Sequence, residues 1–278
     1  MAIPSAQLEA FRVLAQTRNF TQASKKLGLT QSALSQRILN LEAELETTLF
    51  IRAPSGARLT EAAHELLRYC QTKDALESEV LNRLQSKKRG DRLAGTIRVG
   101  GFSSVMGSVI LARLSPLVIQ NPDLKLNFLT RELQELPELL KSGASDFIIT
   151  DHASERNEIE SFQIGEEFNV LVERKGYRGP EIYLDHDEDD QMTLKYLKLA
   201  GLKKSSLQRL FLDDVHGVLS GVRLGLGRAV LPLHLIQDEK QLHVLYREKV
   251  LKSQFFLSFY RQPFYSKLHQ AVTACLKT

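Results

Sequence analysis

Short, neutral hydrogen-bonding side chains recur at helical spacing between residues 31 and 40. At ~100° per residue, Ser32 and Gln36 point almost opposite the leucines of the same segment, with Ser35 and Asn40 on the shoulders. Hydroxyl and amide groups of this kind can donate to and accept from the base edges that line the DNA major groove. The spacing therefore predicts a helix face that reads base pairs, against the ordinary alternative of a solvated face.

Positively charged side chains surround this face in the sequence. Lys25 and Lys26 precede it and Arg37 lies within it, at positions suited to phosphate contacts. Downstream, Arg52 and Arg58 flank the turn-forming segment 53–57, between two short strands. A hairpin there predicts a wing that carries Arg52 or Arg58 to the minor groove or to the DNA backbone.

A short helix with a tight end precedes the polar face. Thr21 is expected to cap this helix, and Gly28 allows the left-handed backbone that ends it. The predicted inner face consists of Phe20, Ala23 and Leu27. Because Ala23 is small, the following helix can approach closely.

The helix that carries the polar face begins after Thr30, which can cap it. Its apolar positions follow the spacing i, i+4, i+7 and i+11 of one buried stripe, at Leu34, Ile38, Leu41 and Leu45. Two such helices joined by a glycine turn have helix-turn-helix geometry. Because cap, turn, stripe and basic hairpin coincide, the pattern favours DNA binding over a merely solvated face.

Residues 61–89 form one run without glycine or proline, which predicts a single long helix. One face of it is apolar apart from Lys73, at Leu66, Tyr69, Leu76, Val80 and Leu84. This face could pack on its own domain or on a second copy of the chain. The length of the helix favours self-pairing, as a linker and dimerisation helix.

The charge of the chain is unevenly distributed. Lysine and arginine number 37 against 33 aspartates and glutamates. Residues 1–92 hold 14 basic and 10 acidic residues, and the remaining 186 residues hold 23 of each. The whole excess therefore lies in the first third, as expected if that third faces double-stranded DNA.

The sequence carries no targeting signal that we recognise. Its first residues lack a basic-then-apolar pattern, and no apolar run approaches the ~18 residues of a membrane span. Cys70 and Cys275 form no CxxC pair, and Cys70 is expected to be a buried apolar residue. These observations predict a cytoplasmic protein without a membrane partner.

From Leu93 onward, apolar strands alternate with helices. This alternation predicts α/β units with a mostly parallel sheet. The expected strands are TIRVGGF, LKLNFL, DFIIT, FNVLVE, EIYL, RAVLPL and FFLSFY.

Residues 8–62 resemble the N-terminal domain of LysR-type transcription regulators, through NFTQASKKLGLTQSALSQRI, LEAEL, LFIR and RLTEAA. The resemblance implies a winged helix-turn-helix, a homodimer or homotetramer, and RNA polymerase as a partner of an activator. It departs from the family at Ser32, where many members have proline, and at Leu39 and Asn40, where many have basic residues. By this resemblance, the base-reading helix holds Gln31, Ser32, Ser35, Gln36 and Arg37, and the wing holds Arg52 and Arg58.

The C-terminal part resembles the family's effector domain, itself similar to type 2 periplasmic binding proteins, through GTIRVGGFSS, SDFIIT and GVLSGVRLGLGRAVLP. The resemblance implies two α/β lobes with a ligand cleft between them. We expect a DNA-binding domain over 1–60, the linker helix over 61–89 and a regulatory domain over 94–278. Its first lobe would span about 94–165 plus 247–278, and its second lobe about 166–246.

Ser103 and Ser104 follow the first strand of this domain and precede a helix. Hydroxyl and backbone N–H groups at such a place can hold a carboxylate, although on the residues alone a serine that simply caps the helix is favoured. The resemblance to the effector domain shifts the expectation to a small anionic effector at Ser103 and Ser104. The segment 130–133 places charged and apolar residues where members often have small polar ones.

Other motifs carry less. GVRLGLG precedes a strand instead of following one, GFSSV lacks the closing glycine of a nucleophile elbow, and no HExxH occurs. The acidic run 185–190 could bind a cation, but a solvated loop is favoured. We therefore expect no catalytic residue, no metal site and no cofactor. An enzyme or transporter component, and a sequence-indifferent DNA binder, are the competing classes.

Overall fold

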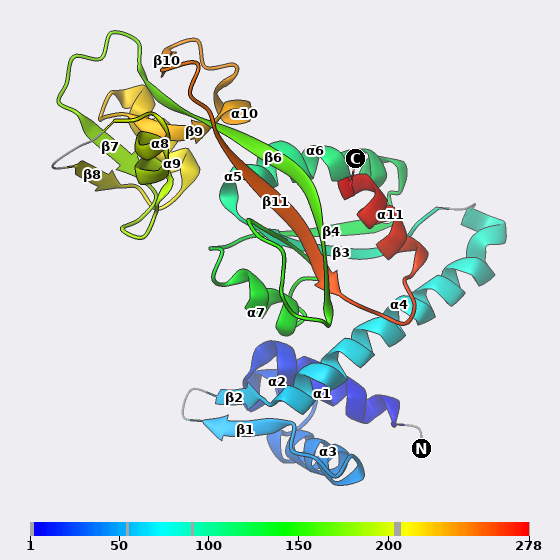
Figure 1. Ribbon diagram of the computed structural model, residues 1–278. Helices are drawn as coiled ribbons and strands as arrows, with labels where there is room; N and C mark the ends of the chain where they lie inside the picture. The colour runs from blue at the N-terminus through cyan, green and yellow to red at the C-terminus, as the bar shows by residue number, and fades with distance from the viewer. Residues whose placement is uncertain (1–2, 54–55, 90–91, 203–206, 278) are drawn as a thin grey trace.

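The computed structural model describes residues 3–53, 56–89, 92–202 and 207–277. Three parts follow one another along the chain: a small N-terminal domain, one long helix and a large α/β domain (Figure 1). This order is the predicted one.

The N-terminal domain is a winged helix-turn-helix. It contains α1 (Ser5–Thr17), α2 (Phe20–Leu27), α3 (Gln31–Glu44) and the hairpin of β1 (Phe50–Ala53) and β2 (Gly56–Leu59). The three helices bury one apolar face each, because their apolar side chains recur at helical spacing. Its best-buried side chains include Leu8, Phe11, Leu14, Ala23, Leu34, Ile38 and Leu41.

The helix ends follow local chemistry, with one correction. Asn19, and not Thr21, caps α2, since its side chain accepts a hydrogen bond from the backbone N–H of Gln22. Thr21 lies within the first turn, where a hydroxyl has no such role. Gly28 ends α2 at a φ of 65°, and Thr30 caps α3 as predicted.

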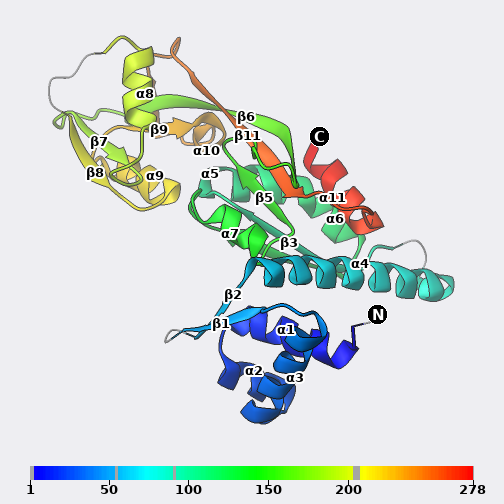
Figure 2. The same cartoon turned by 60° about the horizontal axis from the view of Figure 1, so that its bottom comes forward.

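The helix α4 (Glu61–Arg89) covers the predicted range. Ala63, Leu66, Leu67 and Cys70 complete the core of the N-terminal domain, and the rest of α4 runs along the α/β domain (Figure 2). Its beginning therefore belongs to one folding unit and its middle contacts the other.

The main sheet of the α/β domain has the strand order β10-β6-β11-β5-β3-β4, with β9 also paired to β6. The strands β3 (Gly95–Gly101), β4 (Leu124–Thr130) and β5 (Phe147–Thr150) pair in parallel. The long strands β6 (Ile159–Arg174) and β11 (Leu251–Tyr260) are antiparallel to each other, and β11 is antiparallel to β5. The predicted mostly parallel sheet is thus wrong for this sheet, because both long strands run between the lobes and return in opposite directions.

The buried apolar side chains form separate clusters, and these divide the α/β domain into two lobes. On β6 the core changes between Ile164 and Val170, and on β11 between Leu251 and Phe255. The first lobe adds α5 (Ser103–Val105), the π-helical turn η1 (Met106–Ile110), α6 (Leu111–Gln120), α7 (Leu136–Lys141) and α11 (Lys267–Lys277). The second adds β7 (Ile182–Asp185), α8 (Met192–Leu199), β8 (Gln208–Phe211), α9 (Val215–Leu224), β9 (Ala229–Pro232), α10 (Leu233–Ile236) and β10 (Leu242–Leu245).

Among the described residues, the helical stretch Ser103–Gln120 reaches the length and mean hydropathy of a membrane span, so the expectation that no apolar run approaches that length is wrong. Its apolar side chains Val105, Met106, Ile110 and Leu114 are buried in the first lobe. Arg113 on the same stretch donates to the carbonyl oxygens of Ile164 and Leu276. The stretch therefore packs one side against the first lobe, and 22% of it is buried.

Candidate functional site

The two faces of α3 separate as the sequence predicted. Leu34, Ile38 and Leu41 are buried, whereas Gln31, Ser32 and Gln36 are exposed. Ser35 and Arg37 are half-buried on the shoulders. The polar face is thus open to a partner, while the apolar face fixes the helix on the core.

Two side-chain contacts organise the exposed face. The Oγ atoms of Thr30 and Ser32 lie 3.0 Å apart, and the amide nitrogen of Gln36 donates to the amide oxygen of Asn40 over 2.8 Å. The second bond leaves the Gln36 carbonyl oxygen and the Asn40 NH₂ group for further partners. These are an acceptor and a donor side by side, a pattern that a base edge can match.

The predicted cations lie around this helix. Lys25 and Lys26 are exposed in the last turn of α2, and Arg58 is exposed on β2. The backbone of Arg52 pairs with Ala57 in the hairpin, but the side chain of Arg52 lies outside the described residues, as do Pro54 and Ser55 at the tip.

The position of the wing depends on contacts that the sequence reading missed. Arg18 has a φ of 51°, and its carbonyl oxygen accepts from the backbone N–H of Ala57 over 2.7 Å. A Cβ atom on Gly56 would lie 2.3 Å from that oxygen, so only glycine fits. Glu42 on α3 accepts from the backbone N–H groups of Leu49 and Phe50. In the sequence, Gly56 is a signal for the tight turn of the wing. Nothing in the sequence distinguishes Glu42 from other surface glutamates.

Ser103 and Ser104 lie in the first turn after β3, with Ser103 half-buried and Ser104 9% exposed. No side-chain cap bond is made at this helix start, where Phe102 is the N-cap residue. The loop after β4 reaches the same place, since the backbone N–H of Arg131 donates to Gly101. The helix α5 of the first lobe also contacts α9 of the second, so this end of β3 faces the other lobe.

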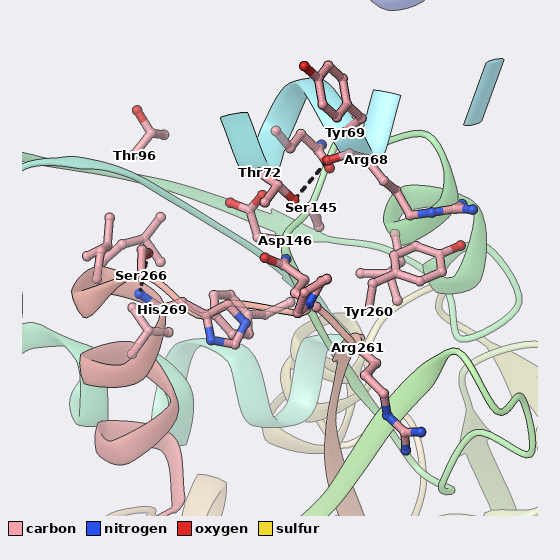
Figure 3. Close-up of a pocket in the computed structure, with 18 residues that line it drawn as sticks. Arg68, Tyr69, Thr72, Thr96, Ser145, Asp146, Tyr260, Arg261, Ser266 and His269 are labelled. Carbon is pink, nitrogen blue, oxygen red and sulfur yellow. Dashed lines mark hydrogen bonds between the residues drawn. The ribbon is translucent and has the colours of Figure 1, made fainter. Parts of the chain in front are cut away.

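A cavity of about 350 Å³ lies between α4 and the first lobe (Figure 3). The Arg68 guanidinium lies over the Tyr260 ring, 4.6 Å from its centre, and Arg98 pairs with Asp146 over 2.9 Å. His269 lines this cavity, and its ring stacks on that of Tyr265. Burial lowers the pKa of His269 to about 4, so this imidazole is neutral at physiological pH.

The N-terminal domain meets the first lobe through α7. Arg18 pairs with Glu138 over 3.2 Å, and Lys141 pairs with Glu61 at the start of α4 over 2.8 Å. The hydrogen bond from Lys141 holds the pKa of Glu61 below its usual value. The side-chain amide of Gln71 donates to the carbonyl oxygen of Gly143, just beyond α7. One short segment thus connects both parts of the molecule.

Comparison with protein families gives two matches along the chain. Residues 5–64 match the bacterial regulatory helix-turn-helix protein, lysR family, and residues 90–278 match the LysR substrate binding domain. The first match contains α2, α3 and the hairpin, and the second contains both lobes. Together they cover the two parts that the long helix joins.

Comparison with individual proteins agrees with these matches. A putative transcriptional regulator of Pseudomonas aeruginosa is 36% identical over 122 residues, which are 44% of this chain and 39% of that protein. The chain thus aligns with less than half of this relative's length. Two solved structures share the fold over 99% of this chain and 97% of their own. ArgP from Mycobacterium tuberculosis has a TM-score of 0.80 at 20% identity. LysG from Corynebacterium glutamicum with bound effector Arg has 0.74 at 16%.

Proposed function

The chain belongs to the lysR family of bacterial regulatory helix-turn-helix proteins, and from this premise we propose how its residues serve a DNA-binding transcription regulator. In this proposal α3 reads the operator, α4 pairs two copies, and a small effector binds between the lobes. The domains are those at 1–60, 61–89 and 94–278, with lobes meeting near 166 and 247. The protein acts in the cytoplasm, with RNA polymerase as a further partner if it activates.

The observation that carries DNA reading is the exposed polar face of α3 above a buried leucine stripe. Gln31, Ser32, Ser35 and Gln36 meet base edges, and Arg37 lies at the border of that face. Lys25, Lys26, Arg52 and Arg58 hold phosphates or the minor groove on either side. This division supports a regulator over a sequence-indifferent DNA binder, which would carry more positive charge and no neutral reading face.

Sequencing the DNA that co-purifies with the protein tests this function. We expect a limited set of fragments that share one roughly palindromic motif. A gel shift with that motif should then withstand an excess of unrelated competitor DNA. A random set of fragments, or equal competition by any duplex, would contradict sequence-specific binding.

The proposed dimer rests on the outer half of α4. Leu76, Val80, Leu81 and Leu84 are 40%, 54%, 55% and 74% exposed, so a single chain leaves this apolar face uncovered. A second α4 would cover it, as in other paired helices. A homodimer, or a homotetramer built from it, would place two α3 helices on two half-sites.

Light scattering at micromolar concentration tests the pairing. Replacing Leu76→Glu together with Val80→Glu should shift the protein to a monomer, because two charges would be buried at the contact. Ser78→Glu, exposed on another face of α4, should leave the oligomer unchanged. A wild-type monomer, or an unchanged oligomer in the double variant, would rule this pairing out.

For the effector we propose a small anionic metabolite that presents a carboxylate to Ser103 and Ser104. The hydroxyl groups and the open helix start at this point support such a ligand. The effector Arg of LysG also has a carboxylate, which favours amino acids in a first screen. A thermal-shift screen of amino acids and organic acids should give a hit that Ser104→Ala weakens and Ser115→Ala does not.

A further inference from the structure

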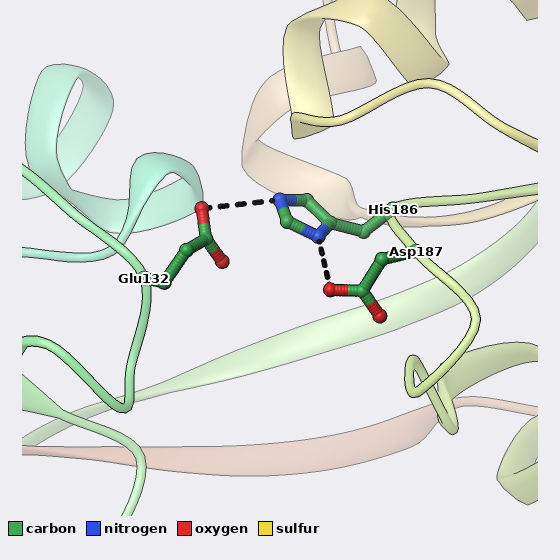
Figure 4. A group of neighbouring side chains, drawn as sticks. All are labelled: Glu132, His186 and Asp187. Carbon is green, nitrogen blue, oxygen red and sulfur yellow. Dashed lines mark hydrogen bonds and ion pairs between the residues drawn. The ribbon is translucent and has the colours of Figure 1, made fainter.

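Three side chains meet across the gap between the lobes (Figure 4). Glu132 comes from the loop after β4 in the first lobe, and His186 and Asp187 come from the loop after β7 in the second. The Nε2 atom of His186 lies 3.5 Å from a Glu132 carboxylate oxygen, and its Nδ1 atom lies 3.1 Å from Asp187. One imidazole ring therefore faces a carboxylate with each of its nitrogens.

The three side chains together offer the ligand atoms of a metal site. One imidazole nitrogen and the two carboxylate oxygens all lie within 4.8 Å of one another, a spacing that a single bound ion can bridge. An imidazole nitrogen beside a carboxylate oxygen is a ligand set that divalent transition-metal ions bind.

We propose that a divalent transition-metal ion of the zinc type binds between His186 Nε2 and the Glu132 carboxylate and ties the two lobes together. Two ligands at 2.0–2.1 Å from a tetrahedral zinc ion are about 3.3 Å apart, close to the separation of these two atoms. Asp187 holds the opposite ring nitrogen, as carboxylates do for many metal-bound histidines. The remaining coordination positions accept water or an anionic ligand.

The second-lobe part of the site is held rigidly. Arg209 pairs with the buried Asp185 and donates to the backbone carbonyl oxygens of Asp187, Glu188 and Asp190. Asp187 also accepts, through its other oxygen, from the backbone N–H groups of Asp189 and Asp190, each over 2.8 Å. Because these hydrogen bonds hold the loop, its imidazole is oriented before an ion binds, which lowers the entropic cost of binding.

The surrounding charge favours a cation. Glu188 and Asp189 follow in the same loop, and the Glu135 carboxylate accepts from the backbone N–H of Glu132 over 3.2 Å. The charge of Arg209 is paired with the Asp185 carboxylate, whereas the Arg131 guanidinium keeps its charge and donates to the carbonyl oxygen of Thr130. An acidic surface with one imidazole at its centre attracts divalent ions and gives preference to those that bind nitrogen.

Titration of the chelator-treated full-length protein with zinc chloride tests the site, by calorimetry and by thermal unfolding. We expect one ion per chain and a rise in the unfolding temperature. His186→Gln and Glu132→Gln should each weaken binding about tenfold or more, and Asp187→Asn about tenfold. Glu188→Gln, which removes the same charge without facing the imidazole, should change the affinity less than about twofold.

Other outcomes would overturn the proposal. Equal binding of magnesium and zinc, unaffected by His186→Gln, would mean that the acidic loop merely concentrates cations. No binding of zinc, with an unfolding temperature that zinc leaves unchanged, would mean that His186 and Glu132 form only a contact between the two lobes. Neither result bears on sequence-specific binding to operator DNA, which the gel shift measures separately.

Discussion

The DNA-reading face and the gap between the lobes are built in opposite ways. The face lies on one helix, α3, whose caps and buried stripe come from residues close by in the sequence. The contact between the lobes joins Glu132 after β4 to His186 after β7, two segments far apart in the sequence that strand pairing over long distances brings together. A site on one helix can be read from periodicity, whereas a site between lobes depends on long-range pairing that periodicity does not specify.

Substitution of one core leucine gives the largest expected effect and tests whether α3 depends on its own stripe. Leu34→Ala should destabilise the N-terminal domain by about 2–5 kcal/mol and abolish operator binding, because the side chain is fully buried. Denaturant unfolding and gel shift measure both. The control Leu39→Ala, 52% exposed on the same helix, should cost less than about 0.5 kcal/mol. Equal losses in the two variants would show that the stripe does not hold α3.

The regulatory domain should differ from the N-terminal domain in its response to acid. The lowered folded-state pKa of His269, about 4 against the usual 6.5, means that the unfolded chain binds a proton first as pH falls. Stability is therefore full above pH 6.5 and declines towards pH 4, by about 3 kcal/mol in total. Besides burial, Glu160 acts to raise this pKa and Lys277 acts to lower it.

Thermal unfolding from pH 4 to 7 checks this decline. His269→Phe keeps a ring among Phe147, Phe259 and Tyr265 and should flatten the dependence over that window. His64 in the N-terminal domain is also buried, and burial lowers its pKa, with Lys141 adding to the effect. If the pH dependence of thermal unfolding changed in His64→Phe but not in His269→Phe, the loss of stability in acid would come from the N-terminal domain, and this prediction would be wrong.

A smaller effect separates base reading from affinity in general. Gln36→Ala should weaken binding to the cognate operator by about 1–3 kcal/mol and barely change binding to a scrambled duplex, because its amide faces outward opposite the leucines. Fluorescence anisotropy with both duplexes measures the difference. An equal loss on the two duplexes would mean that α3 is not the reading helix.

The smallest expected effect concerns a single phosphate contact. Lys26→Ala, at the end of α2, should weaken both duplexes alike and reduce the slope of affinity against salt by about one unit, since one fewer counterion is released. A salt series with operator and scrambled DNA measures this slope. A change confined to the operator would place Lys26 among the base-reading residues.

The parts that could be predicted from the sequence are those with local causes. The helix-turn-helix, the hairpin and the range of α4 follow from periodicity, glycine and caps, and the error at Thr21 moved a cap by two residues. The antiparallel pairing of β6 with β11 was not predicted, because the residue pattern of a strand does not specify which strand it pairs with. The contact of Glu132 with His186 was not predicted for the same reason, although segment 130–133 departs from the family pattern and the run 185–190 offers possible cation ligands.

The first turns of α4 are packed in an apolar core, whereas its contacts with the first lobe are mostly polar. This difference decides where the molecule can bend. Its first turns share the closed core of the N-terminal domain through Leu66 and Leu67, so helix and domain move as one rigid body. In the described residues the first lobe is attached to that body by ion pairs at Glu138 and Lys141, by hydrogen bonds from Gln71 and to Glu79, and by the Arg68 guanidinium over the Tyr260 ring. Exposed ion pairs contribute little to stability, so the softest degree of freedom is rotation of the lobes over α4. We therefore expect a signal from the lobes to change how two α4 helices lie together, leaving the shape of each reading domain intact.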